Sequence, residues 1–373
     1  EKLKLFTKYL QRKHFLSMNF SNEQDSSTQD LNCDNAQNGP GDTVSSIAWA
    51  PNTSVRYFTV GAWDSKLRLY EVQTQMQKYL ALKTTINLDD TPLSMSWTGD
   101  CTKVFCGLAN NYVSMVDLAQ GKGTNVGVHE AGVKDVYWLD RANLLVSLSF
   151  DKTMKIWDCR QQQPVGNFNL GYKVFASDIF DSNLVLGLSE EKILMVDLNN
   201  LASLQKPEYI ESPLGLSSQI TCIGFFSNGE GLGVGSFDGR ANLSTFSKDN
   251  YSGRVKLNNV MTFKCHKIEQ NNSNQQTLFP VHGIGFHPKS KYFVYTAGGE
   301  GNLFYWDYNA KSKIKTFQFK GTPVNKVKMS PDGLLMAYSL GYDWSKGLEG
   351  IGSFKPRICC HILQENELVY RPQ

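Results

Sequence analysis

The fold is decided by the stretch SLSFDKTMKIWD, residues 147–158. It holds one β-rich run, a turn at Asp151, and a second run that ends in a bulky residue followed by an acid, Trp157 and Asp158. Similar endings recur at LYE 69–71, MVD 115–117, MVD 195–197 and YWD 305–307. The successive intervals are 46, 41, 39 and 110 residues. The chain is therefore built from a repeat of roughly 40 residues that is rich in short strands.

The longest interval contains a further unit, GSFDGRANLSTF at 235–246, whose end has lost the acid. The first strands of the units also match, because VSSIAWAP 44–51, VHGIGFHP 281–288 and VNKVKMSP 324–331 all alternate with period two. This period, with several alternating strands in each unit, is typical of the blades of a WD-repeat β-propeller.

A seventh unit, residues 324–363, has no obvious fourth strand. A propeller ring must close to hide its sheet edges, so we predict that a segment within residues 28–40 adds the missing outer strand. The expected fold is all-β: a single seven-bladed WD-repeat propeller over residues 41–373, with the ring closed by an N-terminal strand.

Residues 1–40 are expected to be a disordered or irregular leader, part of which closes the ring. Residues 1–17 carry five basic side chains and one acid, whereas a polar run without apolar periodicity begins at Met18. The basic stretch is interpreted either as a short helix or, as a hypothesis, as sequence upstream of a translation start at Met18.

The net charge of +3 hides an asymmetry along the 373 residues. Lysines and arginines minus acids give 0 for residues 1–40, −5 for 41–250 and +8 for 251–373. Clustered basic residues attract phosphates, so the last third is the part expected to meet a polyanion, unless the fold mixes these charges in space.

Motifs for catalysis or metal binding are missing from the sequence. It contains no P-loop, HExxH, EF-hand, GxSxG or CxxC pattern, and its six histidines are scattered. Adjacent acids, such as Asp89 and Asp90, leave glycoside hydrolysis open as an alternative. We expect no catalytic residues, no metal and no cofactor, and reduced, mostly buried cysteines. No apolar run approaches ~20 residues, so membrane insertion is not expected.

The unit around Trp157 has the fullest set of blade residues. Its resemblance to WD repeats implies a hydrogen-bond relay of His129, Ser147 or Ser149, Asp151 and Trp157 that locks one blade together.

Three segments differ from generic propeller sequence: FKCH 263–266, the turn 236–240, and YDWSKG 342–347. Together they resemble the messenger-RNA export WD-repeat protein of the nuclear pore, the Rae/Gle family, and its paralogue, the Bub-type mitotic-checkpoint protein. The resemblance spans residues 41 to about 363. Because the 342–347 segment is specific to the export type, export is favoured over a checkpoint role.

The resemblance implies a scaffold located in the nucleus, at the envelope and its pores, and also in the cytoplasm. Family members bind a short, acidic Gle-binding segment of an FG-repeat nucleoporin; the paralogues bind the equivalent segment of checkpoint kinases, so kinases or spindle components are the alternative partners. Trp63, Arg240 and Lys267 fall where the family contacts this segment. Lys267 stands in place of an arginine, which would forfeit bidentate pairing, and Trp63 could instead pack within its blade.

The resemblance also implies a groove for single-stranded RNA and ribonucleoprotein, formed by Phe263, Trp306, Asp307, Lys311 and Lys313. Residues 308–331 hold six lysines and no acid. Strand alternation predicts that Lys311, Lys313 and Lys315 lie on one side as a stripe. The alternative is an edge strand that its lysines protect from aggregation.

Overall fold

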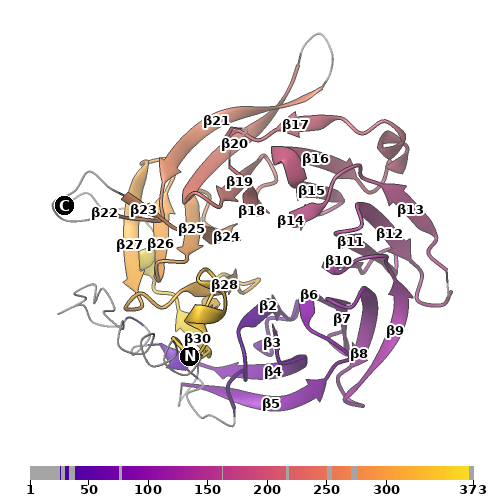
Figure 1. Cartoon of the computed structure of the whole chain (residues 1–373), viewed down its shortest axis with the longest axis horizontal. Coiled ribbons are helices and arrows are strands. Elements are labelled where there is room, and N and C mark those ends of the chain that lie inside the picture. The colour runs from indigo at the N-terminus through magenta and orange to yellow at the C-terminus, as the bar shows by residue number, and fades with distance from the viewer. Residues whose placement is uncertain are drawn as a thin grey trace, which may run out of the picture.

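The computed structural model describes residues 26, 30–32, 38–74, 78–161, 163–215, 218–249, 254–269 and 276–368. Four-stranded antiparallel sheets follow one another around a ring as seven blades, which confirms the predicted fold class (Figure 1). The hypothesis of a start at Met18, and most of the predicted leader, lie outside the described residues.

Each blade is a meander that runs from the centre of the ring to its rim. Blade 1 consists of β2 (Val44–Trp49), β3 (Tyr57–Ala62), β4 (Lys66–Gln73) and β5 (Tyr79–Asn87). Blade 2 consists of β6 (Pro92–Trp97), β7 (Lys103–Leu108), β8 (Tyr112–Asp117) and β9 (Lys122–Val128). Blade 3 consists of β10 (Val133–Leu139), β11 (Leu144–Ser149), β12 (Thr153–Trp157) and β13 (Gly166–Asn169). Blade 4 consists of β14 (Val174–Phe180), β15 (Asn183–Leu188), β16 (Lys192–Asp197) and β17 (Tyr209–Glu211).

An additional small sheet lies between blades 5 and 6 in the chain. Blade 5 consists of β18 (Ile220–Phe225), β19 (Gly231–Ser236), β20 (Arg240–Lys248) and β21 (Val255–Lys264). Blade 6 consists of β24 (Val281–Phe286), β25 (Phe293–Gly298), β26 (Asn302–Asp307) and β27 (Ser312–Gln318). A separate two-stranded sheet, β22 (Lys267–Glu269) and β23 (Gln276–Leu278), lies between them in the chain. The 3₁₀ helices are η2 (Ser189–Glu191), η3 (Leu201–Gln205), η4 (Gly347–Gly350) and η5 (Glu365–Glu367).

Blade 7 closes the ring as predicted. Its strands β28 (Val324–Met329), β29 (Leu335–Leu340) and β30 (Arg357–Ile362) are completed by β1 (Leu31–Asn32), which pairs antiparallel with β30 through Leu31 and Cys360. A strand of two residues supplies few backbone hydrogen bonds, so side chains must help to hold it.

Side chains fasten β1 through the carboxylate of Asp30. This carboxylate accepts hydrogen bonds from Tyr338 Oη (2.6 Å) and His361 Nδ1 (2.7 Å), and His361 Nε2 lies 2.8 Å from Glu367 Oε2. Burial alone would lower the pKa of His361, but its hydrogen bonds to Asp30 and Glu367 outweigh burial and raise the pKa to about 9. His361 is therefore protonated at neutral pH and lies between the carboxylates of Asp30 and Glu367.

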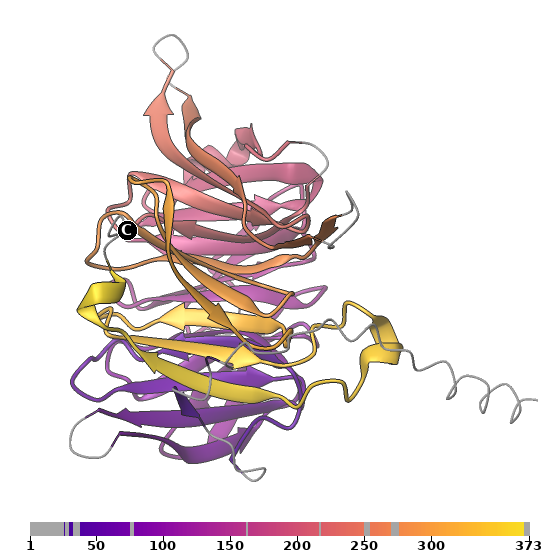
Figure 2. The ribbon, with the colours of Figure 1, turned by 90° about the vertical axis from the view of Figure 1, so that its left-hand side faces the viewer.

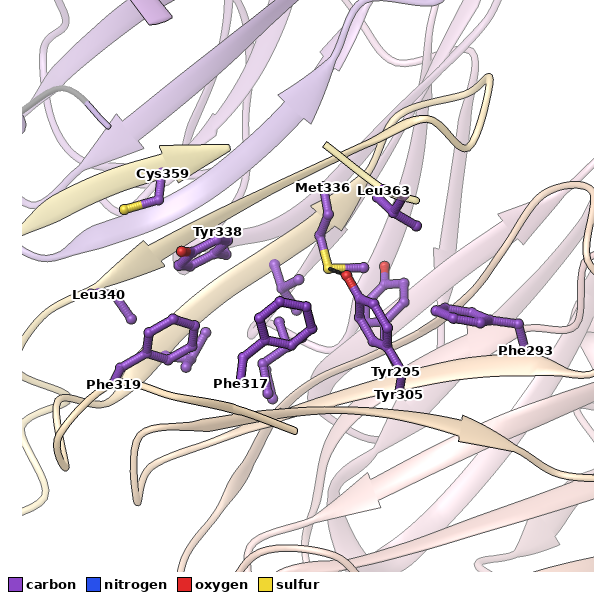
Figure 3. Close-up of a cluster of buried hydrophobic side chains, with 14 residues drawn as sticks. Phe293, Tyr295, Tyr305, Phe317, Phe319, Met336, Tyr338, Leu340, Cys359 and Leu363 are labelled. Carbon is purple, nitrogen blue, oxygen red and sulfur yellow. Dashed lines mark hydrogen bonds between the residues drawn. The ribbon is translucent and has the colours of Figure 1, made fainter. Parts of the chain in front are cut away.

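The core lies between neighbouring blades rather than at the centre of the ring. Between blades 6 and 7 it is strongly aromatic, with Tyr305, Phe317 and Tyr338 fully or nearly fully buried (Figure 3). Aromatic rings bury large areas in such an interface. This packing fixes the angle between the two blades and, with it, the position of the rim strands.

Blade 3 contains the predicted relay. Ser147 Oγ receives Trp157 Nε1–H (2.7 Å) and bonds His129 Nε2 (2.7 Å), while His129 Nδ1 lies 2.9 Å from Asp151 Oδ2. Ser147, not Ser149, is thus the relay hydroxyl, because Ser149 Oγ bonds backbone carbonyls. The seven cysteines among the described residues are all free, and four of them are buried. Within the same residues, no helix is long and apolar enough to cross a membrane.

Candidate peptide and nucleic-acid interfaces

The meander places two kinds of connection on one side of the ring: the turns between the second and third strands, and the links from one blade to the next. We call this side the Trp63 face; it carries Trp63, Arg240 and Lys267. The long loop 341–356 with η4 projects from this side in yellow (Figure 2). All three residues predicted to contact a nucleoporin segment therefore share a face, although they come from different blades.

Arg240 begins β20 directly after a tight turn. Its Nε donates to Asp238 Oδ2 (2.6 Å), and its guanidinium also donates to Ser218 Oγ. Burial would raise the pKa of Asp238, but hydrogen bonds from Ser236, Ser218 and Arg240 lower it. The guanidinium is thus held in one orientation, with about a quarter of its side chain exposed toward solvent. A fixed arginine loses little freedom when it binds a carboxylate.

Gly239 brings the Arg240 turn against the FKCH segment. Its carbonyl accepts N–H bonds from both Cys265 (2.9 Å) and His266 (3.1 Å). Its φ is +74°, and a Cβ at this position would lie 2.3 Å from the His266 carbonyl oxygen. Only glycine fits this close approach. Lys267 follows His266 directly, so Arg240 and Lys267 lie in one sector of the face, where Lys267 Nζ already pairs with Glu269 at 2.5 Å.

Trp63 lies in another sector, in the turn between β3 and β4. It is 49% exposed, so about half of the residue faces solvent and is accessible to a partner. The turn is fixed by Asp64, which accepts bonds from Gly41 N–H and Arg68 Nη1 at 3.0 Å. Thr43, whose carbonyl accepts Trp63 N–H, donates its hydroxyl to the Tyr342 carbonyl (2.8 Å) and so links Trp63 to the blade 7 loop.

Further exposed apolar side chains on the Trp63 face were missed as site residues. They are Phe237, Leu278, Trp344, Leu348 and Ile351, all at least 44% exposed. Phe237 adjoins the Arg240 turn, and Trp344 belongs to the loop next to Trp63. The segment 342–347 stood out in the sequence, but nothing in it indicated that Trp344 would face solvent. Exposed aromatic side chains rimmed by basic residues are typical of a protein-binding surface.

The rim between blades 5 and 6 holds the second candidate surface. Phe263 of β21 and Trp306 of β26 lie 4.8 Å apart between ring centroids, and Lys313 Nζ sits 5.4 Å from the Trp306 ring and 4.2 Å from that of Phe304. Burial lowers the pKa of Lys313. Trp306 is oriented by its Nε1–H bond to Thr296 Oγ1 (3.0 Å). Phe263, Trp306 and Lys313 thus form an aromatic and cationic cluster.

Asp307 and Lys311 belong to the adjoining turn rather than to this cluster. Asp307 Oδ1 accepts the N–H groups of Asn309 and Ala310, both at 2.9 Å, so its observed contacts stabilise the turn. Lys311 is exposed, with a φ of +51°.

The predicted stripe of lysines is wrong. A β-bulge interrupts the pairing of β26 with β27: Trp306 pairs with Lys313 and Tyr305 with Lys315, which leaves Ile314 as the extra residue. Lys315 therefore points to the blade 7 side, where its Nζ lies 4.4 Å from the Phe317 ring and pairs with Glu367. One extra residue reverses the alternation beyond it.

Comparison with known proteins supports the WD-repeat assignment. The family model "WD domain, G-beta repeat" matches residues 32–71 and 123–158. The WD40 repeat protein poxJ of Penicillium oxalicum is 30% identical over 337 residues, covering 88% of this chain and 92% of its own. The poly(A)+ RNA export protein of Schizosaccharomyces pombe is 29% identical, covering 90% and 91% of the two chains.

Protein Rae1 of Drosophila melanogaster is 30% identical over 344 residues, covering 89% of this chain and 94% of its own. The family model and the name of poxJ describe WD repeats, and neither they nor the names of the other two relatives indicate an enzyme family. The similarity covers about nine tenths of the chain at 30% identity, so the chain belongs to the Rae/Gle family of WD40-repeat proteins, whose members include proteins named mRNA export factors.

Proposed function

We propose that this chain acts in mRNA export as a non-enzymatic scaffold at the nuclear pore. The observation that carries the proposal is the similarity over about 90% of both chains to proteins named for RNA export. A ring with two separate surfaces suits a scaffold, because two partners can be bound at once. The Trp63 face would hold a short acidic segment of an FG-repeat nucleoporin, and the rim of blades 5 and 6 would hold single-stranded RNA.

Peptide binding on the Trp63 face is supported by its combination of exposed aromatic rings and a preoriented arginine. Aromatic side chains supply apolar burial, and Arg240 supplies charge-assisted hydrogen bonds to a carboxylate. Because the Arg240 Nε–H already donates to Asp238, a peptide carboxylate must approach the exposed edge of the Arg240 guanidinium.

Affinity for an acidic FG-nucleoporin segment tests this surface. Arg240→Glu should weaken binding at least tenfold, because a carboxylate would face the acidic peptide. Arg141→Glu is the matched control, since Arg141 lies in a turn on the opposite face with a 95% exposed side chain. Equal affinities for Arg240→Glu and Arg141→Glu would remove Arg240 from the site.

RNA binding on the rim is supported by the Phe263–Trp306–Lys313 cluster. Bases can stack on the faces of aromatic rings while lysine attracts the phosphate backbone, a mode that tolerates many sequences and depends steeply on salt. Trp306 is 9% exposed, so Phe263 offers the more accessible ring.

The bulge supplies a matched pair of variants for the RNA test. Lys313→Gln should weaken binding of a single-stranded oligouridine and reduce the slope of log affinity against log salt by about 1. Lys315→Gln should leave affinity and slope unchanged, because Lys315 points toward blade 7 and is paired with Glu367. Titrations at two salt concentrations in which both variants behave alike would contradict this rim site.

A further inference from the structure

The segment that closes the ring has a second anchor ahead of β1. Ser26 precedes Asp30 in the chain, and its Oγ accepts the backbone N–H of Gln318 at 3.1 Å. Gln318 is the last residue of β27 in blade 6. Asp30, by contrast, accepts its hydrogen bonds from two side chains of blade 7. The N-terminal segment is therefore fastened to two neighbouring blades.

A cavity of about 270 Å³ lies at these two anchors. Ser26 and Asp30 line it from the N-terminal segment. The other charged residues of the lining come from three parts of the ring: they are Lys315 of blade 6, His361 of blade 7 with Glu367 shortly after it, and Lys78 directly before β5 of blade 1. The cavity thus lies where the last blade meets the first.

Positive charge is in excess at this cavity, because its lining holds three cations and two carboxylates. His361, which is protonated at neutral pH, lies between Asp30 and Glu367. Lys315 also pairs with Glu367. Burial would raise the pKa of Glu367, but hydrogen bonds from His361 and Lys315 lower it to about 2, so this carboxylate stays ionised. Both carboxylates of the lining are thus already paired with a cation.

The third cation, Lys78, is exposed, and no carboxylate pairs with it among the described residues. A phosphate on a serine carries a charge of about −1.5 to −2 at neutral pH and three acceptor oxygens. On Ser26 it would offset the excess positive charge, and Lys78 and Lys315 can donate charge-assisted hydrogen bonds to it. The cavity has room for several water molecules, and so for the phosphorus and oxygen atoms that the modification adds.

The sequence around Ser26 suits a serine kinase that selects acidic segments. Residues 23–30 read EQDSSTQD, so acids stand at positions 23, 25 and 30. This stretch belongs to the polar run without apolar periodicity that begins at Met18. Polar runs of this kind are typical sites of regulation by phosphorylation. Ser26 therefore combines a suitable sequence with a suitable place to hold the phosphate.

We propose that Ser26 is a phosphorylation site and that its phosphate fastens the N-terminal segment to the ring. An acid-directed protein kinase transfers the γ-phosphoryl group of ATP to Ser26 Oγ. The Oγ–P bond forms, the bond from the γ-phosphorus to its bridging oxygen breaks, ADP leaves, and the hydroxyl proton passes to the catalytic base of the kinase. Because docked Ser26 is half-buried, the kinase acts before the segment docks. The phosphate then binds Lys78 and Lys315 and links the segment to blades 1 and 6.

Hydrogen exchange of the full chain tests the proposal. Phosphoserine is incorporated at position 26 by genetic code expansion, and the modified chain is compared with the unmodified one. The amides of Leu31 and Asn32 report the pairing of β1, and the Gln318 amide reports the docking of Ser26. Phosphoserine should slow exchange at β1 about fivefold. Salt at about 0.5 M should remove most of this effect, because it screens the charges.

Lys78→Gln separates a specific phosphate contact from a general effect of added charge. In the chain with phosphoserine it should reduce the slowing to less than about twofold, and in the unmodified chain it should change exchange little. Lys122→Gln is the matched control, because Lys122 is an exposed lysine at the corresponding end of the outer strand of blade 2. It should leave the slowing intact.

Mass spectrometry of the chain isolated from the cells that make it should find phosphate on Ser26. The proposal is overturned if Ser26 is unmodified in both growing and arrested cells. It is also overturned if phosphoserine leaves exchange at β1 unchanged or speeds it, because repulsion from Asp30 and Glu367 would then outweigh the lysines. Equal slowing in the Lys78→Gln and Lys122→Gln variants would contradict it as well, because the phosphate would then act without the cavity lysine.

Discussion

Blades 3 and 6 carry matching sets of relay residues, but the hydrogen bonds that join these residues differ between the two blades. In blade 3, Trp157 reaches His129 through Ser147, and His129 meets Asp151. In blade 6 the matching residues are Trp306, Thr296, His266 and Glu300: Trp306 bonds Thr296 and His266 Nδ1 bonds Glu300 (2.6 Å). His266 Nε2 and Glu300 Oε2, however, have no hydrogen-bond partner among the described residues. The blade 6 relay is therefore interrupted between its hydroxyl and its histidine.

The difference between the two relays indicates that blade 3 contributes mainly to stability, whereas blade 6 contributes to a candidate binding surface. A complete relay satisfies every buried polar group and holds one blade rigid. In blade 6, the indole N–H of Trp306 donates to Thr296, and the Trp306 ring belongs to the cluster with Phe263 and Lys313. Blade 6, whose internal network is the weaker of the two, thus also contributes to the candidate surface at the rim.

The largest expected effect is that of breaking the complete relay. Ser147→Ala would leave Trp157 Nε1 and His129 Nε2 buried without partners, at a cost of about 3 kcal/mol in the free energy of unfolding. Urea denaturation followed by tryptophan fluorescence and circular dichroism measures this cost. A loss below about 1 kcal/mol would show that the relay does not stabilise blade 3.

A second prediction extends the comparison to the histidine of blade 7. The folded-state pKa of His361, about 9, lies above its unfolded value, so its stabilisation is complete below pH ~6.5 and is lost as pH rises through about 9. Between pH 7 and pH 10 the chain should lose about 2 kcal/mol of unfolding free energy that His361→Gln does not lose. Denaturation at several pH values measures the difference between the two proteins. Parallel pH curves would contradict an ion-paired His361.

The smallest expected effect is in blade 6. Thr296→Val keeps the shape but removes the acceptor of Trp306 Nε1–H, and His266 loses nothing because it does not bond Thr296. The expected cost is about 1 kcal/mol. Urea denaturation beside Ser147→Ala gives the comparison directly; equal costs for the two variants would mean that the two relays are equivalent.

The repeat predicted the overall ring well because each blade needs the same alternating strands. The intervals between acidic endings predicted the blades, and the need to hide a sheet edge placed β1 within residues 28–40. The relay of His129 and Trp157 was implied by the resemblance to WD repeats, and the need of buried polar groups for partners agrees with it. These features depend on residue type and spacing, which the sequence displays.

The candidate surfaces were less predictable because they depend on single departures from the repeat. The alternation of residue types in the sequence gives no sign of the bulge at Ile314, yet this bulge moves Lys315 to the other side of its blade. The exposure of Phe237 and Trp344 depends on how long connections fold over the ring. Contacts of Trp63, Arg240 and Lys267 with a nucleoporin stay a prediction, as do RNA contacts at Lys311, Lys313 and Asp307.

The two-residue strand β1 also constrains when the molecule can become complete during synthesis. Asp30 and His361 are separated by 331 positions, so the N-terminal segment must wait until nearly the whole chain has left the ribosome. At 5–20 residues per second this wait lasts roughly 20–60 seconds. During that time blades 1 to 6 can fold locally, while the segment around Leu31 remains available to chaperones. The last step of assembly is then the docking of the earliest part of the chain.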